Sequence, residues 1–253
     1  MRLITLTTDF GWTEYVGAMK GVIHSIHPGA RVVDITHGVR RFDVRQGAYI
    51  LGTTYLYFPK GTIHCAVVDP GVGTARRGII LSAGSQTFVG PDNGLFSMVE
   101  GVEEAYEIKA KPKARTFWGR DVFAPAAARL AAGAKPQELG RRVNGYERLE
   151  FRAGVSGKLA LGEVICVDHF GDIITSLKEE HLTAIGAEHG ARLEVRLKGK
   201  KRSFRFLESY GHARRGELIC LVGSAGHLEL AVNQGDAAAR LGVAGGEGIE
   251  VRL

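Results

Sequence analysis

The sequence has no long hydrophobic run, and no apolar stretch approaches the roughly 20 residues that a helix needs to cross a bilayer. Its N-terminus also lacks the extended apolar core and small-residue cleavage site of a secretory leader. These absences argue against a membrane-spanning or secreted protein, and we expect a cytoplasmic one.

Cysteine is scarce, with three residues in a chain of 253. Cys65, Cys166 and Cys220 are odd in number, and each lies inside an apolar stretch. This pattern predicts buried, reduced thiols and not a disulfide framework. The sequence also has no cluster of His, Cys and Asp with metal-ligand spacing, so it predicts no metal site.

Neither sign of charge dominates, since 33 Lys and Arg face 27 Asp and Glu for a net charge of +6. The densest basic run spans residues 198–202 and is followed by Phe204 and Phe206. A basic patch beside aromatic rings could bind nucleic acid. A solvated hairpin tip that leads into an alternating strand accounts better for the same residues, and we expect no nucleic-acid partner.

The hydrophobic pattern of the first half alternates between the periods of strands and helices. Expected strands occupy residues 3–7, 32–35, 63–68, 79–82 and 87–89. Expected helices occupy residues 16–26, 44–55 and 122–132. Strands that alternate with helices predict an α/β domain with a mostly parallel sheet and helices on both faces.

The second half has short alternating runs separated by turns that contain glycine, which is typical of strands. The expected strands are 161–167, 173–177, 193–197, 203–207, 217–222, 228–232 and 249–253. They predict a small β-barrel or sandwich. Gly154 and Gly157 flank a polar stretch between the halves, so we predict an N-terminal domain of residues 1–153 and a C-terminal domain of residues 158–253.

Two acidic residues, Asp9 and Asp69, directly follow expected strands. In open α/β sheets ligands bind beyond the carboxyl ends of the strands, which makes both residues candidates for a site. Arg76 and Arg77 come shortly after Asp69 and would point to opposite sides of an extended segment, one of them facing the pocket. An ordinary tight turn is the alternative for residues 69–74. This loop has neither the ending of a phosphate-binding loop nor the spacing of a dinucleotide fingerprint, so spacing alone identifies no cofactor.

The remaining polar candidates are weaker taken alone. His37 follows an expected strand and His64 lies within one, and lone histidines of this kind are more often structural than catalytic. Residues 168–172 place two carboxylates and an aromatic ring on a turn between strands. Such a turn could hold an amine and an aromatic base, or it could be an Asx-rich hairpin.

Taken together, these motifs resemble the S-adenosylmethionine hydroxide adenosyltransferase family, relatives of the fluorinase and chlorinase enzymes. The resemblance runs nearly from end to end. It is carried by residues 7–11, 34–37, 68–74 with the two arginines that follow, 91–94, 116–126 and 168–172.

The resemblance implies an N-terminal α/β domain, a C-terminal β-barrel, and a homotrimer whose sites lie between the N-terminal domain of one subunit and the C-terminal domain of its neighbour. S-adenosylmethionine would be the substrate, and no cofactor is implied. Asp9 would hold the ribose hydroxyls, Asp168 the methionine ammonium, and the turn from Phe170 to Asp172 would lie against adenine. These roles suit carboxylates, which accept from hydroxyls and pair with ammonium groups.

Hydrolases of this family use an Asp-Arg-His set around the attacking water, and Asp69 and Arg76 match its first two members. Trp118 stands at the position of the histidine, and an indole has one donor and no acceptor. We therefore expect slower hydrolysis to adenosine and L-methionine, with Asp69 as the proton acceptor. One alternative is a protein that binds S-adenosylmethionine or adenosine without turnover. Another alternative is a halide-using adenosyltransferase. Two features argue against it: Gly119 supplies no hydroxyl, and the short connection over residues 109–116 leaves little room for the extra loop typical of halogenases.

Overall fold

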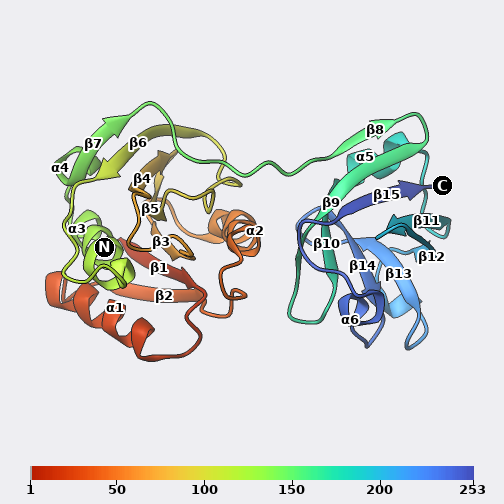
Figure 1. Cartoon of the computed structure of the whole chain (residues 1–253), viewed down its shortest axis with the longest axis horizontal. Coiled ribbons are helices and arrows are strands. Elements are labelled where there is room, and N and C mark those ends of the chain that lie inside the picture. The colour runs from red at the N-terminus through yellow and green to blue at the C-terminus, as the bar shows by residue number, and fades with distance from the viewer. Residues whose placement is uncertain (1) are drawn as a thin grey trace. The chain divides into compact units, whose positions relative to one another are not determined.

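The computed structural model describes residues 2–253, which form two compact units. The first unit ends at Leu149 and the second runs from Glu150 to Leu253 (Figure 1). The domain limits of 1–153 and 158–253 stay a prediction. Domains are parts of a chain that fold independently, and a division into compact units does not test independent folding.

The first unit contains a seven-stranded sheet in the order β2-β1-β3-β5-β4-β6-β7. Its strands are β1 (Leu3–Thr8), β2 (Arg31–Thr36), β3 (Ile63–Val67), β4 (Gly78–Ala83), β5 (Gln86–Pro91), β6 (Val102–Ile108) and β7 (Gly140–Val143). Strands β2, β1, β3 and β5 pair in parallel, whereas β4, β6 and β7 add antiparallel pairings. The carboxyl ends of the parallel strands therefore meet at one edge.

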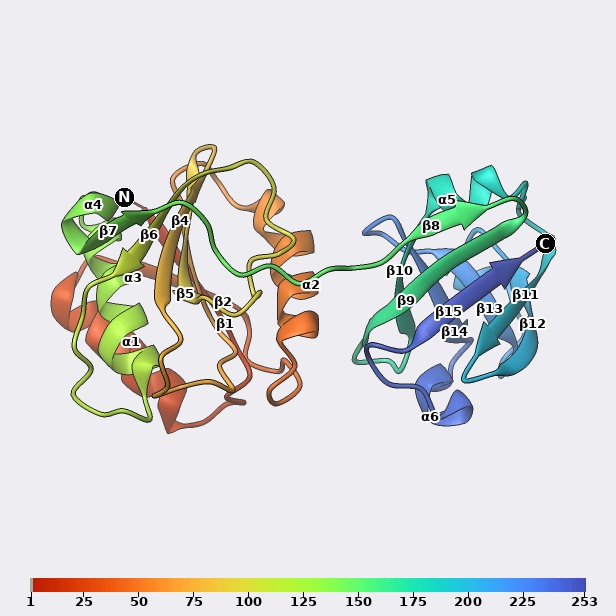
Figure 2. The ribbon, with the colours of Figure 1, turned by 45° about the horizontal axis from the view of Figure 1, so that its top comes forward.

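Helices cover both faces of this sheet, as Figure 2 shows. The helical elements are α1 (Glu14–Ile26), α2 (Val44–Thr54), the 3-10 turn η1 (Tyr55–Tyr57), the π-helical turn η2 (Gly119–Phe123), α3 (Ala124–Ala131) and α4 (Pro136–Leu139). On one face α1 and α3 pack through Met19, Ile23 and Leu130, and on the other α2 packs through Leu51. The predicted α/β architecture is confirmed.

The second unit is a β-barrel. Its strands are β8 (Gly154–Ser156), β9 (Leu159–Val167), β10 (Ile173–Lys178), β11 (Arg192–Leu197), β12 (Lys200–Phe206), β13 (Leu218–Val222), β14 (His227–Val232) and β15 (Gly248–Arg252). A pairing between β10 and β9 closes seven strands into the barrel, and β8 extends β9 outside it. Three short helical elements, α5 (Glu179–Ala184), η3 (Tyr210–His212) and α6 (Ala237–Leu241), complete the unit.

Three expectations from composition can be compared with this fold. All three cysteines are buried and lie outside any disulfide, as predicted. Residues 198–202 form the β11–β12 hairpin tip, where Lys198 and Lys201 pair with Glu247 and Glu194 at 3.1 and 2.8 Å. Among residues 2–253 we find no helix with the length and hydropathy needed to span a bilayer.

Candidate functional site

The first part of the site lies where β1 and β3 end side by side in the parallel half of the sheet. Asp9 follows β1, and one of its carboxylate oxygens, Oδ2, accepts a hydrogen bond from the Phe42 amide at 2.9 Å. Asp69 follows β3, and the negative charge of Asp9 is one of the causes that raise the pKa of Asp69. Burial raises the pKa of Asp9 itself, and hydrogen bonds from backbone amides oppose the rise. The structure thus brings together two residues that lie 60 positions apart.

Asp69 and Arg76 form a buried ion pair. Arg76 Nη2 lies 2.5 Å from Asp69 Oδ2, and only 9% and 5% of the two side chains are exposed. Arg76 Nη1 also donates to the carbonyl of Arg77 at 2.6 Å, so the guanidinium is held at two points. Burial raises the pKa of Asp69, and the charge and hydrogen bond of Arg76 partly oppose this effect. The result is a carboxylate that is a stronger base than an exposed aspartate.

Glycine lets the loop from Asp69 to Arg76 adopt its shape. Gly73 has a φ of +81°, and a Cβ there would lie 2.7 Å from the Arg115 carbonyl oxygen. A side chain at this position would meet both backbone strain and a collision with backbone. The loop therefore lies directly against the segment that precedes Trp118.

The two adjacent arginines go to different partners. Arg77 pairs with Asp92, and its side chain is one-third exposed. Asp92 is buried and accepts a second hydrogen bond from the Glu147 amide at 2.7 Å. Arg76 thus belongs to the site. Arg77 instead links the Asp92 turn to the segment near Gly145, close to the end of the first unit.

The ring of Trp118 packs against the guanidinium of Arg76. The Arg76 Cζ is 4.4 Å from the centroid of the Trp118 ring and 5.4 Å from that of Phe123. Trp118 immediately precedes the π-helical turn η2, a rare conformation that is frequent at functional sites. Its indole Nε1 is buried and has no hydrogen-bond partner among residues 2–253.

Asp69 and Trp118 both line a pocket of about 380 Å³ in the first unit. Three aromatic rings, those of Phe10, Tyr15 and Phe117, form much of its wall, with centroid distances of 5.1 to 5.9 Å. Sequence reasoning did not single out these rings, although Phe10 and Phe117 lie inside the quoted motifs. Such a wall suits a ligand with flat or apolar parts.

The histidines behave as structural residues. His64 contacts Thr5 Oγ1 and Gln86 Oε1 at 2.8 Å each, and burial lowers its pKa to about 4. His37 contacts Thr8 Oγ1 at 2.9 Å, and its other ring nitrogen lies 3.1 Å from Asp34. The pocket that Asp69 lines has neither His37 nor His64 among its described lining residues.

The second part of the site belongs to the barrel unit. Asp168 Oδ1 accepts hydrogen bonds from the amides of Phe170 and Asp172 at 2.9 and 2.8 Å, so the turn is an Asx-type hairpin. Gly171 at its tip has a φ of +86°, which favours glycine. The turn nevertheless presents a free face, because 74% of Phe170 is exposed.

Asp172 shares a tyrosine with a carboxylate that sequence reasoning missed. The Tyr210 hydroxyl lies 2.9 Å from both Asp172 Oδ2 and Glu229 Oε2. Burial raises the pKa of both carboxyl groups, and the bond from Tyr210 opposes the rise. Phe170, Asp172 and Tyr210 line a pocket of about 610 Å³ within this unit. Local sequence gives no signal for the contact, because 38 and 57 positions separate Tyr210 and Glu229 from Asp172.

Comparisons with known proteins cover almost the whole chain. A model of the SAM hydroxide adenosyltransferase N-terminal domain matches residues 4–140, and a model of the C-terminal domain of the same family matches residues 162–250. The chain belongs to this family. The resemblance inferred from its motifs is therefore confirmed.

Similar proteins carry both names that the motifs suggested. A protein of Thermus thermophilus named (R)-S-adenosyl-L-methionine hydrolase is 38% identical, covering 100% of both chains. A protein of an Actinoplanes species named fluorinase is 29% identical over 91% of each. The crystal structure of an uncharacterized conserved protein from Thermotoga maritima is 38% identical, with a TM-score of 0.92 over 99% of this chain and 100% of that one.

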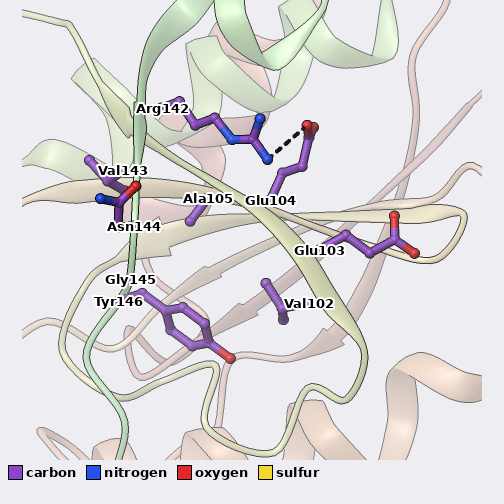
Figure 3. A pocket seen from close by; sticks show the side chains of 9 residues that line it. All are labelled: Val102, Glu103, Glu104, Ala105, Arg142, Val143, Asn144, Gly145 and Tyr146. Atoms are coloured by element: carbon purple, nitrogen blue, oxygen red, sulfur yellow. Dashed lines mark ion pairs between the residues drawn. The ribbon is translucent and has the colours of Figure 1, made fainter.

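A further pocket of about 320 Å³ lies where β7 diverges from β6 in this family member (Figure 3). Its opposite charges, Glu104 and Arg142, pair with each other at 3.6 Å. No predicted site residue is among its described lining residues. Within residues 2–253, no group of three or more His, Cys, Asp or Glu is arranged to hold a metal ion.

Proposed function

We propose that this chain hydrolyses S-adenosyl-L-methionine at the bond between its sulfonium sulfur and ribose C5', which yields adenosine and L-methionine. The observation that carries the proposal is the buried Asp69–Arg76 pair beside a pocket at the carboxyl edge of the sheet. The proposal is supported by similarity to a protein named (R)-S-adenosyl-L-methionine hydrolase, which is 38% identical over the whole length of both chains.

Asp69 is the proton acceptor in this proposal. The oxygen of a water molecule forms a bond to C5', the electron pair of the C5'–S bond passes to sulfur, and the sulfonium becomes the neutral thioether of methionine. One proton of the water goes to Asp69. No acid is needed for the leaving group, so a single base suffices, and such a base typically contributes about 10²- to 10⁴-fold.

Arg76 orients that base, and Asp9 binds the ribose. Since Asp69 Oδ2 is engaged by Arg76, Oδ1 is the oxygen available to the water proton. Asp9 Oδ2 is engaged by the Phe42 amide, which leaves Oδ1 to accept from a ribose hydroxyl. Trp118 has no acceptor and takes no proton.

The barrel unit supplies the groups for the two ends of the substrate. Asp168 pairs with the methionine ammonium, and the turn from Phe170 to Asp172 contacts adenine, with the ring of Phe170 available for stacking. We infer from the family resemblance alone that the protein is a homotrimer in which a neighbouring subunit provides this barrel. No cofactor enters the reaction. Three buried cysteines outside any disulfide fit a reducing, cytoplasmic compartment.

A second candidate function is binding of S-adenosylmethionine or adenosine without turnover. The observation that favours it is Trp118, which replaces the acceptor of the usual set with a group that only donates. A halide-using enzyme is a weaker candidate, because Gly119 has no hydroxyl and the fluorinase relative is less similar than the hydrolase.

Liquid chromatography of the purified protein with S-adenosylmethionine tests these functions. We expect adenosine and methionine in amounts that exceed the enzyme, with and without chloride, and loss of both in Asp69→Asn. Turnover in ¹⁸O-labelled water should place the label in adenosine. Tight calorimetric binding without product would instead support the binding protein, and a chlorinated adenosine would support a halide user.

A further inference from the structure

Arg76 lies in a corner formed by two aromatic rings. The ring centroids of Trp118 and Phe123 are 6.3 Å apart, and the Arg76 Cζ lies 4.4 and 5.4 Å from them. Phe123 is fully buried and belongs to the core, whereas Trp118 also lines the pocket. Trp118 and Asp69 thus both contact Arg76 and line the pocket, of which Arg76 itself is not a described lining residue.

This arrangement restrains the two terminal nitrogens and one face of the guanidinium, whereas its buried Nε has no hydrogen-bond partner among the described residues. Its edge binds Asp69 and the Arg77 carbonyl, and its face packs on indole. A planar, delocalised cation stacks on aromatic rings as an ammonium group does not. The same ring helps to keep water from a pair whose side chains are no more than 9% exposed. Excluded water strengthens the interaction between the two charges.

We propose that Trp118 is a positioning residue of the hydrolytic site, an inference that rests on the proposed function. Its ring fixes the Arg76 guanidinium and shields the Asp69–Arg76 pair from water, so that Asp69 keeps one oxygen in place for the attacking water. In this chain the aromatic face takes over the role of improving the base, since Trp118 offers no acceptor of its own.

The shielding has a consequence that a merely structural ring lacks. Burial is the largest cause of the raised Asp69 pKa, and the charged groups that act on it are Arg76, which lowers it, and Asp9, which raises it. Water that enters beside Asp69 weakens both the effect of burial, which raises the pKa, and that of the Arg76 charge, which lowers it, and burial is the larger of the two effects. Loss of the ring should therefore lower the Asp69 pKa and weaken the base.

Two apolar substitutions of similar size separate the aromatic face from simple packing. Trp118→Phe keeps a ring against Arg76, and Trp118→Leu does not. We expect kcat to stay within about threefold of the wild type in Trp118→Phe and to fall about 10- to 10²-fold in Trp118→Leu, as misplacement of a reacting group predicts. The KM for S-adenosylmethionine should change little in both. The acid limb of the kcat/KM profile should move to lower pH only in Trp118→Leu.

Trp12→Phe is the matched control, because it makes the same change at a residue that is 78% exposed and does not line the pocket. It should behave as the wild type. Circular dichroism checks that each variant folds, and Trp118→Met replaces Trp118→Leu if the latter does not.

The outcomes separate this inference from the proposed function. A wild-type protein that releases no adenosine overturns the proposed function, and this inference with it. An active wild type together with a Trp118→Leu variant of equal kcat and unchanged acid limb overturns only the role of Trp118. Equal losses in Trp118→Phe and Trp118→Leu also overturn it, because they would assign the effect to the indole N–H and not to the ring.

Discussion

At the scale of single residues, the adjacent arginines offer a direct comparison. Arg76 is buried, stacked on Trp118 and bonded to Asp69, whereas Arg77 is one-third exposed and bonded to Asp92. The sequence predicted that the two would diverge. It did not reveal that Arg76 would stack on the residue at the family's histidine position, because that contact joins segments more than 40 positions apart.

Substitution of lysine for Arg76 or Arg77 should separate the contribution of positive charge to activity from that of the planar guanidinium. Arg76→Lys keeps the positive charge but loses the planar face and the two-point attachment, so we expect kcat to fall at least about tenfold. Arg77→Lys should retain wild-type kcat within about twofold, since it contacts neither the pocket nor Asp69. Steady-state release of adenosine measures both. Equal losses in the two variants would show that Arg76 has no special role.

The pH dependence of the reaction should report Asp69. A general base acts in its deprotonated form, so kcat/KM should fall as pH falls through the pKa of Asp69. Because burial raises that pKa, the acid limb should lie above the ordinary value of an aspartate. No histidine lines the described pocket, so we expect one proton in this limb. A second limb near pH 6.5 in the wild type would contradict the assignment of Asp69 as sole acceptor.

At the scale of elements, strands with a clear apolar pattern were predictable, and very short or highly charged strands were not. All seven strands expected in the second half are present. The apolar pattern does not predict β6, β7 or β8, because β6 carries three glutamates, β7 has four residues, two of them arginine, and β8 has only three residues. β7 is the edge strand of the antiparallel part of the first sheet and β6 is its neighbour, and at such an edge solvent relaxes the demand for apolar side chains.

The π-helical turn was also beyond prediction. The sequence suggested a single helix from 122 to 132, but residues Gly119–Phe123 form the π turn and α3 begins at Ala124. Periodicity does not distinguish a π turn from the first turn of an α-helix. The turn matters because it sets Trp118 at its start and Phe123 at its end, and thus both rings that contact Arg76.

Glycine-to-alanine substitutions test this element against an ordinary helix. A Cβ at Gly119 would lie 3.2 Å from both Met19 and Phe117, whereas one at Gly17 in α1 would meet nothing within 4 Å. We expect Gly119→Ala to destabilise the protein by about 1–3 kcal/mol through overpacking. Gly17→Ala should stabilise it by about 0.5–1 kcal/mol, as an alanine does in an exposed helix interior. Urea unfolding measures both, and a neutral Gly119→Ala would show that the turn yields easily.

At the scale of the whole molecule, the candidate residues fall into two sets on two units. Asp9, Asp69 and Arg76 belong to the first unit, and Asp168 and Asp172 belong to the second. Asp69 lines the pocket of the first unit and Asp172 that of the second, whereas Asp9, Arg76 and Asp168 are not among the described lining residues of either pocket. The family resemblance implies this division of the candidate residues between an N-terminal and a C-terminal domain. In the proposed trimer the two sets of one site come from different subunits, an arrangement that no local pattern in the sequence encodes.

Complementation between two inactive variants tests the proposed trimer. Asp69→Asn damages only the first set and Asp168→Asn only the second, so each homotrimer should lose most of its activity. If sites form between subunits, an equal mixture that is unfolded and reassembled has intact pairs of units in about a quarter of its sites, because each half is intact with even odds. We therefore expect about a quarter of wild-type activity to return. Sites formed within one chain would contain one damaged half in every case, and no activity would return on mixing.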